Sequence, residues 1–521
     1  MNKKMIVKLR LMVMTLALFA AAGVGYGANT YYVWTNSPSE GAPYDGWNNA
    51  AHAIQTALNS SASNDTVLVT NGVYDAGTTL APGPNLLKNR VCVTNAVTLR
   101  SVNGPEFTII KGAPDGVTGS NGDAAVRCVY LTNSASLIGF TLTNGYTMTN
   151  GDSIFDTGAG GVVLFANTVV SNCVISGNMA LYSAGAVLYY GGTMNNCTLS
   201  GNRALGTAGA YLYYGGTMNN CTLSVNVATT VNAGGASLSY GGTMSNCMLS
   251  GNSSPANGGG VYFLGAGGTM NYCTFSNNYA GSQGGGAYCN QNGIFNNSLL
   301  VGNRTSGDGG GAYLYRRDAT MNNCKLTGNM STNNGGGVFI ERQYVSSSAQ
   351  CLLKNCLFIG NQSRNTAANI GGGGAYLSQG GTLSNCTFYG NTAVNVGGGM
   401  YLVSGVNGTG AVNNCIIWGN NNDSSSNIFI AAGSTATVNY TCSGPVQTGT
   451  GNIGGDPFFV DTNTANYRLT AGSPCVNAGA NSAWMTGAKD LDGRSRIDRF
   501  NGRVDMGAYE WVYNGMIYRI P

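Results

Sequence analysis

The sequence contains few charged residues and almost no histidine. Charged residues make up 8% of its 521 positions, against about 25% in typical soluble proteins, and no Asp or Glu lies between Asp156 and Asp308. His52 is the only histidine, which excludes a histidine-based catalytic triad and a multi-histidine metal site. The net charge of +4 is too small for this length to indicate nucleic-acid binding. Solubility must therefore depend on Asn, Ser, Thr and Gly.

Long apolar runs are also missing, except at the N-terminus. An apolar stretch from Leu11 to Gly23 follows the basic residues Lys3, Lys4, Lys8 and Arg10 and precedes the small residues Gly25 and Gly27. This order predicts that residues 1–28 are a secretory signal. The stretch is shorter than the roughly 20 residues that a membrane span needs, and we expect no membrane span after signal removal.

A short motif that repeats at a nearly fixed interval organises the rest of the chain. GGTMNNCTLSGN at Gly191–Asn202 recurs almost unchanged at Gly215, Gly241 and Gly267, and Cys173, Cys197 and Cys221 are 24 residues apart. A second block, of the form GGGAYL, accompanies it in each unit. Such a period indicates a repeat architecture whose units are stable only when they stack on their neighbours.

The repeated runs are too short for helices and are bounded by Gly, Asn and Ser, so they predict strands of about 3 to 5 residues. We therefore predict an all-β fold, a right-handed single-stranded parallel β-helix with one unit per coil. About a dozen coils would form a rod roughly 60 Å long. Like positions would stack: Met194, Met218, Met244, Met270 and Met321 in one inward column, and Asn178, Asn202, Asn226, Asn252, Asn278, Asn303 and Asn329 in a ladder of amide hydrogen bonds.

The pattern resembles the pectin-lyase-like superfamily and the repeats of chlamydial polymorphic outer-membrane proteins. Their GGA and F-x-x-N motifs are matched by Gly-Gly-Ala-Tyr and by Phe275–Asn278, Phe358–Asn361 and Phe388–Asn391. This resemblance covers roughly Gly158 to Asn420 and implies a fold rather than an activity, because enzymes and adhesins share the scaffold.

The N-terminal part, residues 29–85, is expected to form a cap and the first coil. Ala50, Ile54, Ala57 and Leu58 have helical spacing within Trp47–Leu58, and the segment is similar to the capping helix of pectin-lyase-like proteins. A cap is needed because an open end exposes the core and a strand edge. His52 falls in this predicted helix, which favours a structural role. The β-helix body follows over residues 86–451.

Charged residues return in residues 452–511. Asp456-Pro-Phe-Phe-Val-Asp461, Asp490-Leu-Asp-Gly-Arg494 and Val504-Asp-Met-Gly-Ala-Tyr-Glu510 resemble the choice-of-anchor Q domain, which implies a bacterial surface protein with a sorting tail. The tail here, residues 512–521, has no apolar span and no basic end, which leaves plain secretion open. Asp490 and Asp492 resemble part of a Ca²⁺ loop without its later ligands. Ca²⁺ is therefore a weak alternative to a salt-bridge network, and no other cofactor is expected.

Fifteen cysteines in an exported chain would normally indicate disulfides. Most occupy one equivalent position per coil beside Leu or Phe, which favours a buried column of free thiols. Side chains stacked in one column point the same way, a poor geometry for a disulfide. Cys351 and Cys356 are expected to lie off this column or at its insertion, and they are the first candidates for an exception.

Two groups of residues are candidates for function. The first is a charged cluster on neighbouring coils, which an enzyme would use: Asp308, Arg316, Arg317, Asp318, Glu341 and Arg342. The alternatives are an exposed ion-pair cluster and a site for an acidic sugar. The second is an aromatic stripe expected to face outward: Tyr211, Tyr262, Tyr288, Tyr313, Phe339, Tyr376 and Tyr401. The alternatives are a ligand-binding surface and a self-stacking ladder that stiffens the sheet.

These patterns favour a secreted or cell-surface bacterial protein that binds a polysaccharide or another surface ligand without catalysis, as an adhesin does. The alternative is a polysaccharide lyase or glycoside hydrolase that acts at residues 308–342. A third interpretation is a purely structural spacer, which predicts neither binding nor turnover.

Overall fold

The computed structural model describes residues 28–231, 233–316, 318–342, 350–367, 370–404, 409–421, 427–498 and 502–512. The predicted signal, except for Ala28, and the tail beyond Val512 lie outside the described residues, as does Arg317. Among the described residues, no helix has the length and apolar character needed to cross a bilayer.

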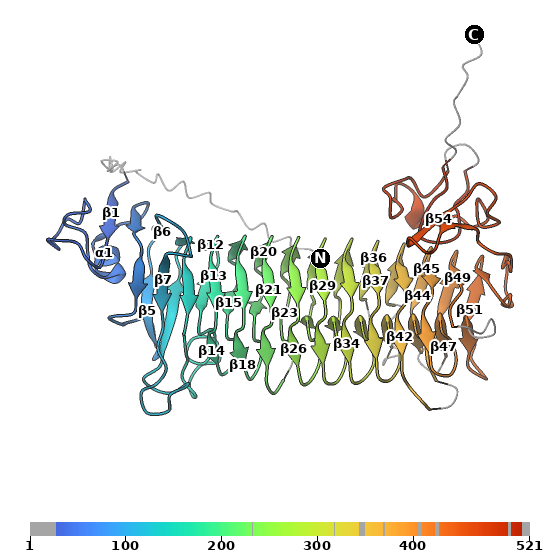
Figure 1. Ribbon diagram of the computed structural model, residues 1–521, viewed down its shortest axis with the longest axis horizontal. Coiled ribbons are helices and arrows are strands. Elements are labelled where there is room, and N and C mark those ends of the chain that lie inside the picture. Colours follow the sequence, from blue (N-terminus) through green and yellow to red (C-terminus); the bar gives the residue numbers. More distant parts are fainter. Residues whose placement is uncertain are drawn as a thin grey trace, which may run out of the picture.

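The chain forms a parallel β-helix, drawn as a long rod in Figure 1. One coil consists of β16 (Thr193–Asn195), β17 (Thr198–Ser200), β18 (Arg203–Ala204) and β19 (Ala210–Tyr213). The next coil begins with β20 (Thr217–Asn219), which pairs with β16 in parallel so that Met194 faces Met218. Equivalent residues of successive coils are thus neighbours, and the sequence period is the length of one coil.

Stacking of the coils produces four sheets along the rod. Sheet A has 15 strands, from β1 (Thr30–Val33) to β51 (Thr437–Asn439); sheet B has 14, from β3 (Gly72–Tyr74) to β52 (Cys442–Ser443); sheet C has 14, from β4 (Thr79–Leu80) to β50 (Ile428–Ile430); and a short sheet has nine, from β14 (Met179–Ala180) to β46 (Thr392–Ala393). At about 4.8 Å between strands, the 15 strands of sheet A make the rod roughly 67 Å long, slightly longer than the sequence predicts.

The corners of each coil require left-handed backbone. Between β16 and β17 the chain turns at Asn196, with φ of 53°, and after β17 it turns at Gly201, with φ of 61°. Asn and Gly are the residues that adopt this region most readily, which explains the Asn-Cys and Gly-Asn pairs of the motif.

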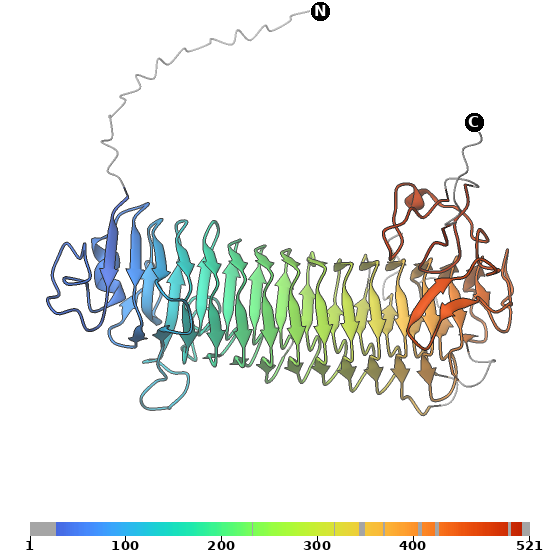
Figure 2. The ribbon, with the colours of Figure 1, turned by 45° about the horizontal axis from the view of Figure 1, so that its top comes forward.

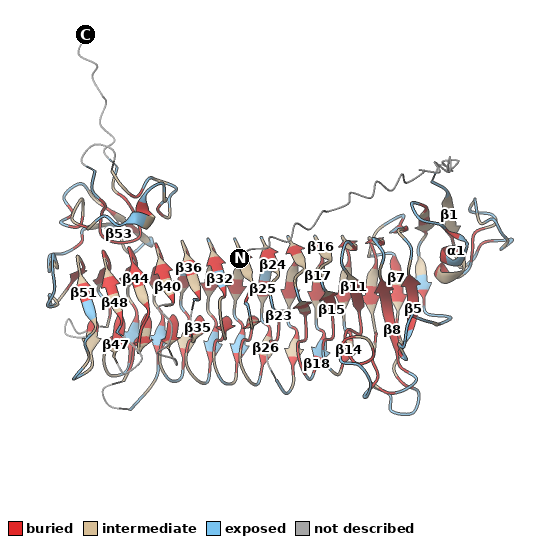
Figure 3. Ribbon diagram, turned by 180° about the vertical axis from the view of Figure 1, so that it is seen from behind, coloured by how far each residue is buried: buried red, intermediate tan, exposed pale blue. Residues whose placement is uncertain are grey.

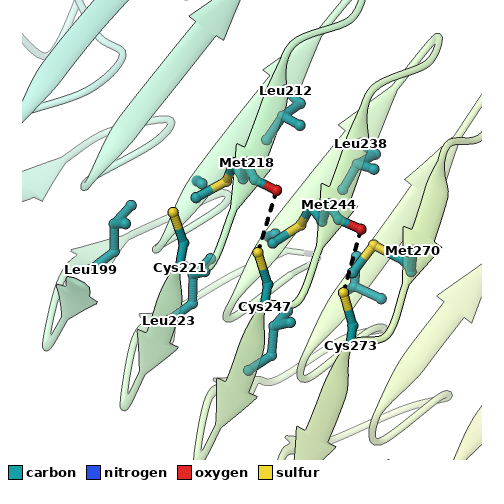
Figure 4. Close-up of a cluster of buried hydrophobic side chains, with 14 of the residues drawn as sticks. Leu199, Leu212, Met218, Cys221, Leu223, Leu238, Met244, Cys247, Met270 and Cys273 are labelled. Atoms are coloured by element: carbon teal, nitrogen blue, oxygen red, sulfur yellow. Dashed lines mark hydrogen bonds between the residues drawn. The ribbon is translucent and has the colours of Figure 1, made fainter. Parts of the chain in front are cut away.

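The core consists of the inward columns that the repeat predicts. Met194, Leu199 and Leu212 are fully buried and Cys197 is nearly so, and the inward faces of the strands form the buried interior in Figure 3. Figure 4 shows Cys247 and Cys273 donating hydrogen bonds to the carbonyl oxygens of Met218 and Met244 in the preceding coil, at 3.5 and 3.4 Å. The predicted Met column is confirmed.

All fifteen cysteines are buried free thiols in the structure. Cys356 belongs to the column: its thiol donates to the carbonyl of Met321 at 3.4 Å, as that of Cys324 donates to the carbonyl of Phe295 at 3.5 Å. Cys351 does lie off the column, just before β40 (Leu352–Lys354), and burial raises its pKa to about 12. The register of the column is kept across this longer coil, because Met321 pairs with Leu353 and Leu326 with Phe358.

The Asn ladder is also confirmed and is longer than predicted. The side-chain amide of Asn252 donates to Oδ1 of Asn278 at 3.0 Å and to the carbonyl of Leu223 at 2.9 Å, while its Oδ1 accepts from Asn226. The same bond joins consecutive members from Asn178 through Asn202, Asn226, Asn252, Asn278, Asn303, Asn329, Asn361, Asn391 and Asn420 to Asn427. A buried amide per coil is thereby satisfied in both its donor and its acceptor capacity.

The N-terminal end is closed by α1 (Ile54–Ser60), whose Ile54, Ala57 and Leu58 are buried. The helix begins later than predicted, so His52 precedes it. The His52 ring contacts Glu40 (Nδ1 to Oε2, 3.1 Å) and the carbonyl of Ser37 (3.0 Å). These contacts hold the loop before the helix.

Residues 452–512, here called the C-terminal unit, leave the coil and fold back against the side of the rod (Figures 1 and 2). The unit contains the hairpin β53 (Phe459–Asp461) and β54 (Asn466–Leu469) and the 3-10 helix η2 (Ala483–Met485). Its apolar residues pack on sheet B, whose outward positions change there from Thr198 and Ser200 to Leu357 and Ile416. Outward apolar residues of these coils, such as Leu357 and Ile416, are therefore buried by the unit.

Candidate functional site

The predicted aromatic stripe exists as one continuous stack of rings on sheet C. Its members follow one another on β27 (Val261–Leu264), β31 (Ala287–Cys289), β35 (Ala312–Tyr315), β39 (Val338–Glu341), β43 (Ala375–Ser378) and β47 (Met400–Val403). Neighbouring rings from Tyr262 through Tyr288, Tyr313, Phe339 and Tyr376 to Tyr401 are 4.7–5.2 Å apart and nearly parallel. Tyr211 does not join them, because Ser237 separates it from Tyr262.

This stack is not the exposed surface that the alternation of inward and outward residues along a strand predicts. Tyr288, Tyr313, Phe339 and Tyr401 are buried, and Tyr313 is only 2% exposed. Burial raises the pKa of Tyr288 and of Tyr313 well above the usual range. The ring faces are occupied by neighbouring rings, so the arrangement is that of a ladder that stiffens sheet C.

The charged cluster is brought together in part. The hydroxyl of Tyr313 donates to Oε2 of Glu341, and the main-chain nitrogen of Arg316 donates to the carbonyl of Glu341 at 2.8 Å. Asp308 accepts hydrogen bonds from the main chain and side chain of Asn334 at 3.0 and 3.1 Å. Burial raises the pKa of Asp308, and the charge of Glu341 adds to this. Asp308 and Glu341 thus lie within electrostatic range of each other and have different hydrogen-bond partners.

The other members of the cluster are more peripheral. Asp318 is exposed, Arg342 is half-buried, and the guanidinium of Arg316 lies 5.0 Å from the ring centroid of Tyr315. Arg317 lies outside the described residues.

The carboxylates of the weak Ca²⁺ candidate have protein partners. Both oxygens of Asp490 accept main-chain hydrogen bonds, from Asp492, Arg494 and Glu510 at 2.7–2.9 Å. Asp492 forms a bidentate pair with Arg468 at 2.5 and 2.6 Å. In the part of the chain that the structure describes, no three His, Cys, Asp or Glu side chains form a group that could hold a metal ion. The loop is therefore held by main-chain hydrogen bonds and a salt bridge.

A different group of aromatic side chains, not identified from the sequence, is exposed. Tyr190, Tyr214 and Tyr240 are 55%, 42% and 45% exposed and stack with centroids 4.9 and 4.8 Å apart. Tyr189 and Tyr213 meet this row nearly at right angles, each 4.6 Å from the tyrosine that follows it in sequence. We call these five residues the tyrosine platform. Since the ring faces in the row are stacked, the surface left to solvent is mainly ring edges and phenol groups.

The platform is built at corners where tyrosine is conformationally disfavoured. Tyr190, Tyr214 and Tyr240 directly follow strands of sheet C, at the start of the turn to sheet A, and have φ values of 54°, 55° and 60°. Such left-handed backbone costs a bulky side chain about 1–3 kcal/mol. Asn occupies equivalent conformations elsewhere in this chain, as at Asn196. The repeated Tyr-Gly-Gly triplets were the signal in the sequence, because the two glycines after each tyrosine indicate a sharp corner that turns the ring outward.

A scan against protein-family models found no match, and a search of curated proteins found no relative. Among solved structures, the chain is similar to a pectate lyase (13% identity, 94% of this chain and 98% of that chain, TM-score 0.35). It is also similar to the catalytic unit of an alpha-1,3-glucanase from Streptomyces thermodiastaticus (14% identity, 75% and 69%, TM-score 0.33) and to a rhamnogalacturonan lyase (13% identity, 92% and 97%, TM-score 0.27). At this identity the function must be argued from the residues of this chain.

Proposed function

We propose that the protein is a non-catalytic carbohydrate-binding β-helix protein that binds a polysaccharide through the tyrosine platform. The observation that carries the proposal is the exposed row Tyr190, Tyr214 and Tyr240, kept in a backbone conformation that disfavours tyrosine. Strained residues persist where function or the surrounding structure requires them.

The chemistry of the platform suits a neutral sugar chain. A phenol offers an apolar ring edge and a hydroxyl that both donates and accepts hydrogen bonds, which matches the alternating C–H and O–H groups of a sugar. No Asp or Glu lies between Asp156 and Asp308, so the coils that contain Tyr190, Tyr214 and Tyr240 carry no carboxylates that would select a cationic ligand. A ligand lying along the rod would meet one tyrosine per coil.

The location and domain organisation belong to the same proposal. The protein is exported by residues 1–28 and acts in the extracellular space or at the cell surface. Residues 29–85 form the cap and 86–451 the β-helix body, with repeats of the polymorphic outer-membrane protein type. Residues 452–511 form a choice-of-anchor Q-like domain and 512–521 a tail. The change from coils to a hairpin and loops after residue 452 supports the boundary between residues 451 and 452.

The test uses a triple variant, Tyr190→Asn, Tyr214→Asn and Tyr240→Asn. Asn tolerates left-handed backbone, so the rings are removed without adding strain. The matched control is Tyr272→Asn, because Tyr272 is 62% exposed, has φ of 54° and lies at a different corner, between sheets A and B. Thermal melting of all variants checks that the fold is kept.

Affinity electrophoresis in gels containing neutral or acidic polysaccharides provides the readout. We expect at least one neutral polysaccharide to retard the native protein and the control equally, and the triple variant to migrate freely. Equal retardation of the triple variant in the gels with neutral polysaccharides, or no retardation by any neutral polysaccharide, would contradict the proposal.

A second candidate is hydrolysis or β-elimination of a polysaccharide at Asp308 and Glu341. The observation in its favour is that Asp308, whose pKa burial raises, lies within electrostatic range of Glu341, since glycoside hydrolysis uses a pair of carboxyl groups. Release of reducing ends or unsaturated products by the native protein, and its loss in Glu341→Gln, would establish this activity.

A further inference from the structure

Two adjoining cavities lie between the rod and the C-terminal unit, one on each side of Trp484. The larger has a volume of about 460 Å³ and is lined by Ser384, Asn413, Asn439 and Trp484, among others. The smaller has about 370 Å³ and is lined by Asn322, Lys354 and Trp484, among others. They lie far along the chain from the tyrosine platform.

The floor of both cavities is a single row of outward side chains on sheet A. Each residue ends one of five consecutive strands, β36 (Thr320–Asn322), β40, β44 (Thr382–Ser384), β48 (Ala411–Asn413) and β51. The pairing register aligns Asn322, Lys354, Ser384, Asn413 and Asn439 in that order. Four strand steps of about 4.8 Å make this row roughly 19 Å long. The two cavities are therefore parts of one groove that runs along the rod.

The wall of the groove is fixed to the corner asparagines of the rod. At one end, Asn414 donates to the carbonyl of Ala480 and accepts from its main-chain nitrogen, both at 2.8 Å. At the other end, Asn355 donates to the carbonyl of Lys489 at 2.7 Å. Since η2, which contains Trp484, lies between these two attachments, the groove is pre-organised, and a ligand would not have to order it.

The charge in the groove has one sign. Nζ of Lys354 lies 5.2 Å from the ring centroid of Trp484, and Lys489, whose Nζ donates to Ser495 at 3.1 Å, lines the smaller cavity. Neither cavity is lined by Asp or Glu. A ligand that enters the groove therefore meets a cation beside an aromatic side chain and has no carboxylate to repel an anion.

We propose that this groove binds an acidic oligosaccharide, with Trp484 against a sugar ring and Lys354 paired with a carboxylate or sulfate. The floor of amides and hydroxyls suits a hydroxyl-rich ligand, because Asn and Ser both donate and accept hydrogen bonds. Of the five strands beneath it, β36, β40, β44 and β48 are paired on both sides and only the end strand β51 has an unpaired edge, so most of the groove offers no free strand edge to a peptide. The site is independent of the tyrosine platform and does not depend on the function proposed for it.

Isothermal titration calorimetry tests the groove with four probes: a chondroitin sulfate hexasaccharide, its desulfated form, neutral cellohexaose and an oligoglutamate peptide. We expect at least one of the two acidic hexasaccharides to bind at least tenfold more tightly than cellohexaose. We expect Trp484→Ala and Lys354→Gln each to weaken that binding tenfold or more. Tighter binding of the sulfated hexasaccharide identifies the anion as sulfate. Equal or weaker binding of it identifies the anion as carboxylate, which both hexasaccharides carry.

The control variants separate this site from other surfaces. Lys325→Gln removes an exposed lysine on sheet B, in β37 (Lys325–Thr327), outside the groove, and should leave the affinity unchanged. The triple platform variant should also leave it unchanged. Binding of neither acidic hexasaccharide, equal affinity in Trp484→Ala and Lys354→Gln, or Trp484-dependent binding of the oligoglutamate alone would overturn the proposal.

Discussion

Removal of one amide from the Asn ladder should destabilise several coils at once. Asn252 is fully buried, and its side chain takes part in four hydrogen bonds, to Leu223 and Asn278 as donor and from the main chain and side chain of Asn226 as acceptor, all at 2.9–3.1 Å. At about 1 kcal/mol net for each bond, Asn252→Ala should lower the free energy of unfolding by about 4 kcal/mol. The buried N–H of Asn226 would lose its acceptor, which makes relief by local rearrangement costly.

The matched control is Asn246→Gly, because Asn246 is an exposed corner residue of the same coil with φ of 54°. Gly adopts this conformation without strain, so we expect the control to cost less than about 1 kcal/mol. Urea unfolding followed by circular dichroism gives the loss of stability. Hydrogen exchange read by mass spectrometry shows where it occurs, because repeat proteins unfold locally as well as globally.

We expect Asn252→Ala to unfold at lower urea concentration and to lose exchange protection in the coils of Asn226, Asn252 and Asn278. If Asn252→Ala and Asn246→Gly were equally stable and equally protected, the ladder would contribute little and the reasoning would be refuted.

Three further predictions concern the thiol column and a partly buried acid. Cys221→Ser should lower the free energy of unfolding by only about 1 kcal/mol, because the new hydroxyl can donate to the carbonyl of Asn219 as Ser298 donates to Asn296 at 3.0 Å. Urea unfolding measures this change. A loss above about 3 kcal/mol would show that the column does not tolerate a hydroxyl. Titration with a thiol reagent should find many free thiols in denatured protein and few in native protein, whereas adjacent-coil disulfides in unreduced mass spectra would contradict the free-thiol column. Burial raises the pKa of Asp308 in the folded state. The free energy of unfolding is therefore higher below the unfolded pKa of about 3.9, where the carboxyl is protonated in both states, and falls as the pH rises through the folded pKa, because the carboxyl must then ionise in its buried place. Asp308→Asn should remove this part of the pH dependence and be relatively more stable at pH 7 than at pH 3; an unchanged pH profile would show that the folded-state pKa is not raised.

The sequence predicts the parallel β-helix well, because the fold follows from local repetition. A Met or Asn that recurs once per coil must stack on its equivalents, so Met194 and Asn202 could be assigned to columns without coordinates. The position of Cys356 is less clear from the sequence, because the longer spacing before it hides the period, although its place in the core column is unchanged.

The functional surfaces are less predictable because they depend on how side chains cover one another. Alternation places Tyr313 outward, but it does not show that the neighbouring rings lie within 5.2 Å and bury it. The groove at Trp484 depends on contacts such as that between Asn355 and Lys489, which are 134 residues apart. A repeat pattern carries no information on where such a distant segment docks, although the apolar outward residues Leu357 and Ile416 indicate that something covers those coils.

The most direct test of the central claim is a crystal structure of the protein with the neutral oligosaccharide that corresponds to its best polysaccharide ligand. We predict density for sugar residues along Tyr190, Tyr214 and Tyr240, with hydroxyl groups within hydrogen-bonding distance of the phenols. Density for the neutral sugar only at Asp308 and Glu341, or only in the groove beside Trp484, would contradict the assignment of the tyrosine platform as the binding surface.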